Sequence, residues 1–96
     1  MLDHFVISIE NASLSTYPNP LENNSTFDFA IPATENVVLE VINMNGDKVG
    51  VLFSGVVEGG IAKKVNFDAS ELSSGIYFVQ LTTPTQFLKE KIVIIK

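Results

Sequence analysis

The fold is decided by one stretch of the sequence, residues 37–53, which reads VVLEVINMNGDKVGVLF. Apolar side chains at positions 37, 39 and 41, and again at 49, 51 and 53, share one face of an extended chain, because successive side chains of a strand point to opposite faces. Between the two halves lies Asn45-Gly46, which is typical of a type I′ turn, in which both central residues have positive φ. The stretch therefore predicts an antiparallel β-hairpin.

The same period of two continues on both sides of this hairpin. It predicts further strands at residues 5–9, 26–31, 61–68, 75–81 and 86–95, which are rich in Val, Ile, Phe and Tyr. Gly59-Gly60 predicts a second hairpin that leads into residues 61–68, and residues 69–72 allow at most a single helical turn. Six or seven short strands separated by turn signals predict an all-β fold, an antiparallel β-sandwich.

Charge and residue usage exclude several classes of function. The 6 basic residues are all lysines and stand against 11 Asp and Glu, so the net charge of −5 argues against a nucleic-acid partner, which needs clustered cations. The chain has no cysteine and a single histidine, His4, near the chain end, which disfavours metal sites and acid–base catalysis. We therefore expect no enzyme activity and no cofactor. No apolar run approaches the ~20 residues of a membrane-spanning helix.

Two weaker patterns favour a structural role over a chemical one. Asn43, Asn45 and Asp47 alternate like the oxygen ligands of calcium, but the segment is too short for an EF-hand loop, and a hairpin turn explains these residues more simply. Most aromatic residues fall on predicted core faces, and the scattered carboxylates are interpreted as a solvated acidic surface. Neither pattern predicts a catalytic site.

One boundary stands out near the beginning of the chain. Small polar residues at 11–16 precede Tyr17-Pro18-Asn19-Pro20, and both features favour extended, exposed chain. We expect a linker here, so that residues 1–13 are a linker or an extra N-terminal strand of the preceding region and residues 14–96 are the domain. The pattern equally allows residues 5–9 to be the first strand of the sandwich. No secretory signal peptide is seen at the start, so the signal of an exported protein would lie further upstream.

Four features occur in a fixed order along the chain. They are Tyr17-Pro18-Asn19-Pro20, the strand–turn–strand at 41–49, the segment LSSGIY at 72–77, and a final strand punctuated by lysines. Together they resemble the type A C-terminal sorting domains of the type IX secretion system, or Por secretion system, of Bacteroidetes, and the resemblance covers residues 14–96. The residues that carry it, or that we expect to serve recognition, are Tyr17, Pro18, Asn19, Pro20, Asn45, Gly46, Leu72, Gly75, Tyr77, Lys89, Lys91, Val93 and Lys96.

The resemblance implies a small Ig-like sandwich that acts as a C-terminal secretion and sorting signal. Such a domain directs an upstream passenger through the periplasm and across the outer membrane to the cell surface or the medium. The outer-membrane translocon and the shuttle proteins of the system would recognise it, and a sortase-like peptidase would then remove it. We expect a monomer with no catalytic, cofactor-binding or metal-binding residues and no transmembrane segment.

Each motif also has a physical interpretation. Pro18 and Pro20 fix φ and lack amide donors, so they can border a sheet, and Asn19 is expected to close a turn between them. Gly75 is expected to adopt a backbone angle that a residue with a Cβ avoids. Tyr77 either makes the corner hydrogen bond of Ig-like sandwiches or packs in the core.

The final strand, residues 87–96, has two interpretations. If it lies at a sheet edge, its unpaired amides and carbonyls can accept a partner by strand addition, and Lys89, Lys91 and Lys96 mark the correct partner. Alternatively, the lysines serve only to keep an edge strand soluble.

Two rival functions remain open. An Ig-like or fibronectin-like module for carbohydrate binding or adhesion would expose aromatic residues such as Phe53, Tyr77 and Phe78. A structural spacer would instead be followed by further chain beyond Lys96.

Overall fold

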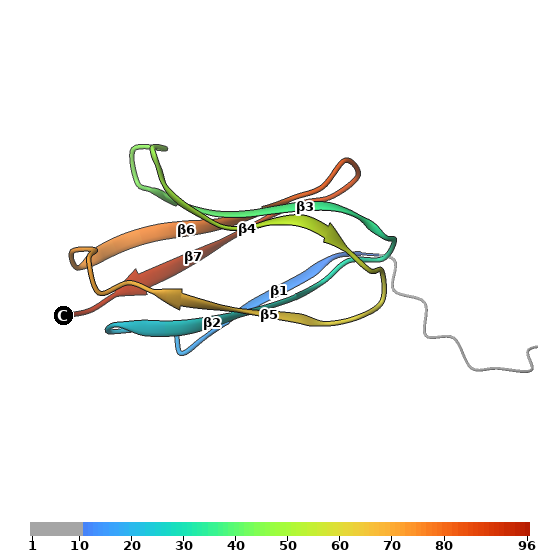
Figure 1. Cartoon of the computed structure of the whole chain (residues 1–96). Coiled ribbons are helices and arrows are strands. Elements are labelled where there is room, and N and C mark those ends of the chain that lie inside the picture. The colour runs from blue at the N-terminus through green and yellow to red at the C-terminus, as the bar shows by residue number, and fades with distance from the viewer. Residues whose placement is uncertain (1–10) are drawn as a thin grey trace, which may run out of the picture.

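The computed structural model describes residues 11–96, and these residues form seven β-strands. The strands are β1 (Ser13–Tyr17), β2 (Asn24–Ala30), β3 (Glu35–Asn43), β4 (Lys48–Val57), β5 (Lys63–Asp68), β6 (Gly75–Thr82) and β7 (Phe87–Ile94). They pair antiparallel in two sheets with the strand orders β1-β2-β5 and β4-β3-β6-β7. Figure 1 shows the two sheets stacked face to face. The predicted all-β antiparallel sandwich of six to seven strands is confirmed.

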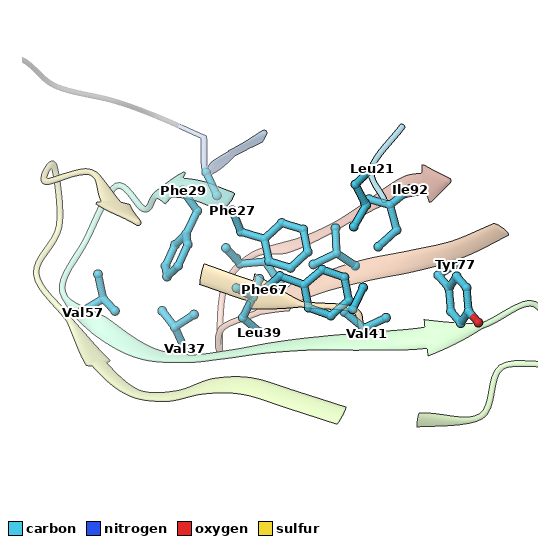
Figure 2. Packing of buried hydrophobic residues seen from close by; sticks show 14 of the residues in the cluster. Leu21, Phe27, Phe29, Val37, Leu39, Val41, Val57, Phe67, Tyr77 and Ile92 are labelled. Atoms are coloured by element: carbon cyan, nitrogen blue, oxygen red, sulfur yellow. The ribbon is translucent and has the colours of Figure 1, made fainter. Parts of the chain in front are cut away.

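A single hydrophobic core lies between the two sheets. Alternate residues of β2, β3 and β6 point into it, as the period of two predicts. The rings of Phe27 and Phe67, from neighbouring strands of the smaller sheet, stack with their centroids 5.2 Å apart (Figure 2). Burying a large apolar side chain contributes roughly 1.5–3 kcal/mol, so this core holds together a chain that has no disulfide. The described part of the chain contains no helix that is long and apolar enough to cross a membrane.

The hairpin between β3 and β4 forms where the sequence predicts it, but its turn type differs. Gly46 has a φ of 86°, and no residue other than glycine has positive φ in the described range, so the predicted type I′ turn is wrong. Gly46 N–H donates to Asn43 O and Asn43 N–H donates to Asp47 O, which defines a three-residue loop with glycine in the left-handed position. The Asn43 side chain stabilises this loop, because its Oδ1 accepts from the N–H groups of Asn45 and Asp47 at 2.9 Å.

The predicted second hairpin at Gly59-Gly60 is also wrong. The strands on either side of it, β4 and β5, belong to different sheets, so this segment carries the chain across the sandwich. The Gly60 N–H donates to Ile31 O at 2.7 Å, and a Cβ at Gly59 would come within 2.7 Å of the Ala33 backbone. The crossing places β5 beside β2 in the smaller sheet, where the Phe67 ring stacks on that of Phe27 and is buried. The two glycines therefore predict a turn, but they do not predict which sheet the following strand joins.

The expected linker at residues 11–16 is wrong from Ser13 onward. Residues 13–17 are β1, which pairs with β2, and Leu14 packs against the core between exposed serines. Ala12 is buried, and its N–H donates to Gln86 Oε1 at 3.1 Å. Exposed and half-buried side chains thus alternate along β1, as expected for an edge strand. The strand predicted at residues 5–9 lies outside the described residues, and the division into residues 1–13 and 14–96 stays a prediction.

The corner before β6 has the conformation that the sequence predicts. The Leu72 N–H donates to Ala69 O, which forms the single turn expected at 69–72. Gly75 has a φ of 155°, and the Tyr77 hydroxyl donates to Ser73 O at 2.8 Å while its ring is buried. Tyr77 therefore serves both interpretations, as a core residue and as a tyrosine corner.

Replacing Gly75 with alanine tests this corner. A Cβ at this position would meet only Tyr77 Cε1, at an ordinary 3.8 Å, so the expected loss of at least ~1 kcal/mol in the free energy of unfolding comes from the backbone angle. Chemical denaturation measures it. Gly50→Ala in β4 is the matched control, because a Cβ there meets nothing within 4 Å and the φ is not in the left-handed region. Equal stabilities of the two variants would contradict the role of Gly75.

Candidate recognition site

The segment after β1 reaches across the sandwich to the outer edge of β7. The Asn19 side chain donates from Nδ2 to Lys91 O at 3.0 Å, and its Oδ1 accepts from Val93 N–H at 3.1 Å. Leu21 continues the contact through its backbone, since its N–H donates to Val93 O and its C=O accepts from Ile95 N–H. We call these contacts the clasp; it consists of Asn19 and Leu21 against residues 91–95.

The clasp bears on two expectations about these motifs. Asn19 does not only close a turn between the prolines, because its amide pairs with the backbone of β7 as another peptide group would. The final strand does lie at a sheet edge, which was the condition for strand addition, but the clasp occupies the backbone groups of its C-terminal half. The sequence analysis did not identify Leu21, which is only 2% exposed. A single apolar residue after a proline is not part of any alternating hydrophobic pattern, so it gives no signal.

A second set of contacts fixes Tyr17 at the start of the same segment. Lys64 Nζ donates to the Tyr17 hydroxyl and to Asp28 Oδ2, both at 2.8 Å, and lies 5.5 Å from the Tyr17 ring centroid. The hydrogen bond to Asp28, reinforced by that to Tyr17, raises the pKa of Lys64 above its usual range. Because the lysine is exposed and the carboxylate is only half-buried, this ion pair orients the ring more than it stabilises the fold. Behind them, the buried Ser25 hydroxyl donates to Pro18 O at 2.8 Å.

The three lysines of the final segment lie in three different environments. Lys89 Nζ lies 4.6 Å from the ring centroid of Phe78 on the neighbouring strand, and the Lys91 side chain is exposed. Lys96 Nζ instead donates to the carbonyls of Ala69 and Ser70, at 2.8 and 3.0 Å. Lys96 therefore ties the chain end to the turn after β5, whereas Lys89 and Lys91 face outward from the sheet.

Most of the motif segments lie at one end of the sandwich, whereas β7 begins toward the other end, where Gln86 accepts a hydrogen bond from Ala12 N–H. The loops after β1, β3 and β5 lie at the same end as the last residues of the chain, while β1 begins toward the opposite end (Figure 1). Asn45 and Gly46 form the tip of the β3–β4 loop, and Leu72 packs against the core beneath the β5–β6 loop. Pro20 is exposed beside the clasp. Motifs that are far apart in sequence therefore share one surface.

The aromatic residues expected for a carbohydrate-binding module are not exposed as a platform. Tyr77 is buried, and Phe53 and Phe78 are half-buried. Lys63 Nζ lies 4.8 Å from the Phe53 ring centroid, much as Lys89 covers Phe78. A sugar ring therefore finds no free aromatic face at these three positions.

In the described residues, no group of three or more His, Asp or Glu side chains lies close enough to hold a metal ion. Two of the acidic side chains, Glu35 and Asp68, accept hydrogen bonds from nearby residues of the fold. The Thr85 hydroxyl donates to the Glu35 carboxylate and lowers its pKa, and the Ser70 N–H does the same for Asp68. The site thus offers backbone groups, cations and hydrogen-bonding side chains for recognition.

Replacing Asn19 with alanine tests the clasp. The variant loses both side-chain hydrogen bonds to β7, so we expect the free energy of unfolding to fall by about 1–2 kcal/mol. Hydrogen exchange at the Val93 amide should accelerate strongly. Asn36→Ala is the control, because this exposed residue makes no side-chain hydrogen bond within residues 11–96. Unchanged protection of Val93 would refute the clasp.

The environments of the lysines predict different costs for their removal. Lys96→Gln loses charge-assisted hydrogen bonds to two carbonyls and should lower the free energy of unfolding by roughly 0.5–1 kcal/mol. Lys91→Gln should leave it within ~0.5 kcal/mol, because its side chain is exposed. Thermal denaturation compares the two. An equal loss in both variants would mean that Lys96 has no anchoring role.

Comparison with known proteins agrees with this architecture. The family model described as "Secretion system C-terminal sorting domain" matches residues 15–95. Among solved structures, dimeric latent PorU from Porphyromonas gingivalis has a similar fold, with a TM-score of 0.72 and 17% sequence identity; the match covers 98% of this chain and 10% of that one. The chain thus spans about a tenth of that protein's length. No curated protein matches the sequence. Since the family model covers nearly all of the described residues, the chain belongs to the family of type IX secretion C-terminal sorting domains.

Proposed function

We propose that this domain is recognised as a folded unit by the outer-membrane translocon and the shuttle proteins of the type IX system. The family to which it belongs is the C-terminal sorting signal of that system, which implies export across the outer membrane. The domain directs a passenger on its N-terminal side to the cell surface or the medium. A sortase-like peptidase then cuts upstream of β1 and removes the domain.

The observation that carries this proposal is the gathering of the motifs at the end opposite the entering chain. Asn19 and Val93 are 74 positions apart in sequence, yet their side chain and backbone are joined by a hydrogen bond. The surface around them exists only when both sheets have formed. A receptor that reads this surface can therefore distinguish the folded domain from an unfolded chain.

The polarity of the domain also fits a signal at the end of a passenger. β1 begins toward one end of the sandwich, where Ala12 N–H donates to Gln86, and the clasp lies toward the other end (Figure 1). A passenger attached through the N-terminal side would thus leave the motif surface uncovered. The domain acts as a monomer without a cofactor and without catalysis, and its family is typically non-catalytic.

A reporter fusion tests this function. The whole 96-residue chain is joined to the C-terminus of a periplasmic fluorescent protein that carries its own export signal, in a bacterium with a type IX system. We expect the reporter to become accessible to protease added to intact cells. The same fusion in a strain without the translocon should remain in the periplasm.

The reporter without the domain controls for leakage, and circular dichroism of the purified fusion shows that the domain is folded. A folded fusion that stays in the periplasm of the competent strain would contradict the proposed function.

A further inference from the structure

The outer edge of β7 is regular along its whole length. β7 pairs with β6 over all eight of its residues without a register shift. In an antiparallel pair, the N–H and C=O groups of alternate residues point toward the partner, and those of the residues between them point away. The clasp identifies the outward set, because the groups it binds are Lys91 O, both groups of Val93 and Ile95 N–H.

The same alternation defines the half of the edge that the clasp leaves open. The backbone groups of Phe87 and Lys89 and the N–H of Lys91 also point away from β6. Within residues 11–96 these five groups have no hydrogen-bond partner. They form a short row of donors and acceptors that ends at the clasp, so a strand of about five residues could pair here.

The side chains beside this open row are cationic on the outer face of the sheet. Phe87, Lys89 and Lys91 are exposed there, and Lys89 is held against Phe78. On the opposite face, Glu90 accepts a hydrogen bond from the Thr16 hydroxyl at 2.8 Å. The next carboxylate across the outer face, that of Glu40, is paired with Lys48 at 3.3 Å. On the outer face, the unpaired charge next to the open row is therefore positive, whereas Glu90 carries its charge on the opposite face.

This arrangement disfavours pairing with a second copy of the same edge in the register centred on Lys89. In an antiparallel pairing of two β7 edges, Lys89 would face Lys89, and like charges directly opposite each other destabilise a sheet. The other edge of the same sheet is less suited to strand addition, because β4 has two irregularities in its pairing with β3, and such bulges disturb the ladder. The β7 edge therefore disfavours pairing with a copy of itself and favours pairing with a strand of opposite charge.

We infer that the open edge of β7, residues 87–91, is the docking site for an extended acidic segment of a partner protein. This segment adds as a fifth strand to the sheet β4-β3-β6-β7, and its backbone pairs with Phe87, Lys89 and Lys91. Its carboxylates lie beside the two lysine side chains, and the clasp sets the limit of its length. The inference rests on the proposed function in one respect, that the partner is a component of the secretion machinery.

Nuclear magnetic resonance with two synthetic peptides tests the edge directly. The probes are acetyl-TEVEVET-amide and its matched basic counterpart acetyl-TKVKVKT-amide, added to the whole chain. The acidic peptide should shift the amide signals of Phe87, Lys89 and Lys91, and the basic peptide should not. Lys89→Pro should weaken binding about tenfold or more, since it removes an outward donor but no hydrogen bond to β6.

Charge and folding are controlled by further variants. Lys89→Gln keeps the backbone N–H of position 89 and should weaken peptide binding less than the proline variant. Lys48 lies on β4 at the other edge of the sheet, so Lys48→Gln should not change peptide binding. Should Lys89→Pro fail to fold, the double variant Lys89→Glu with Lys91→Glu leaves the backbone intact and should still abolish binding. Shifts with both peptides, or with neither at millimolar concentration, would overturn the inference.

The export assay links the edge to the secretion machinery. The Lys89→Pro or double-glutamate fusion should stay folded in the periplasm, while the Lys48→Gln fusion reaches the surface. Normal export of both edge variants overturns the docking site but leaves the sorting function intact. Failure of the unaltered fusion to export contradicts the sorting function, and the peptide experiment then still decides whether the edge binds acidic strands.

Discussion

The pairing of Asn19 and Leu21 with β7 is the interaction on which the candidate site depends. β7 is an edge of the larger sheet, and the segment that binds it leads from β1 to β2 in the smaller one. These hydrogen bonds therefore join the two sheets along one side, where face-to-face packing alone would leave both edges free. They also place the Tyr17 ring and the final strand at fixed positions relative to each other, since a side-chain amide tolerates little change in its bonding geometry.

Much of the fold follows from local sequence, and the parts that do not are set by distant contacts. The period of two placed β2 to β7 but not β1, and the conformations of Gly75 and Tyr77 depend on a few neighbouring residues. By contrast, the chain after Gly60 crosses to the smaller sheet, where Phe67 stacks on Phe27 of a strand distant in sequence, and no local signal carries that information. The turn at Gly46 differs from expectation because an asparagine side chain two residues upstream of the central dipeptide bonds into the loop.

The sequence names some residues of the candidate site, such as Asn19, but it misses Leu21 and does not show the arrangement. Lys89, Lys91 and Lys96 look alike in the sequence, yet one covers an aromatic ring, one is exposed and one binds two carbonyls. Their difference arises from the residues that the fold brings beside them, which belong to β6 and to the turn after β5. In the same way, Asn19 has the features of a turn residue, and its actual partner lies on the last strand. Spacing along a chain cannot show contacts of this separation.

Because the clasp covers only part of the β7 edge, the domain can avoid aggregation and still offer a site for a partner strand. An open edge along all of β7 would offer a template to any extended chain, which is the usual cause of edge-to-edge aggregation. The clasp covers the C-terminal part of the edge, where Val93 and Ile95 would present an apolar strand. The part that stays open carries Lys89 and Lys91, so uncharged or basic strands gain little from pairing there. What remains is a short site whose length is limited by hydrogen bonds and whose partner is selected by charge.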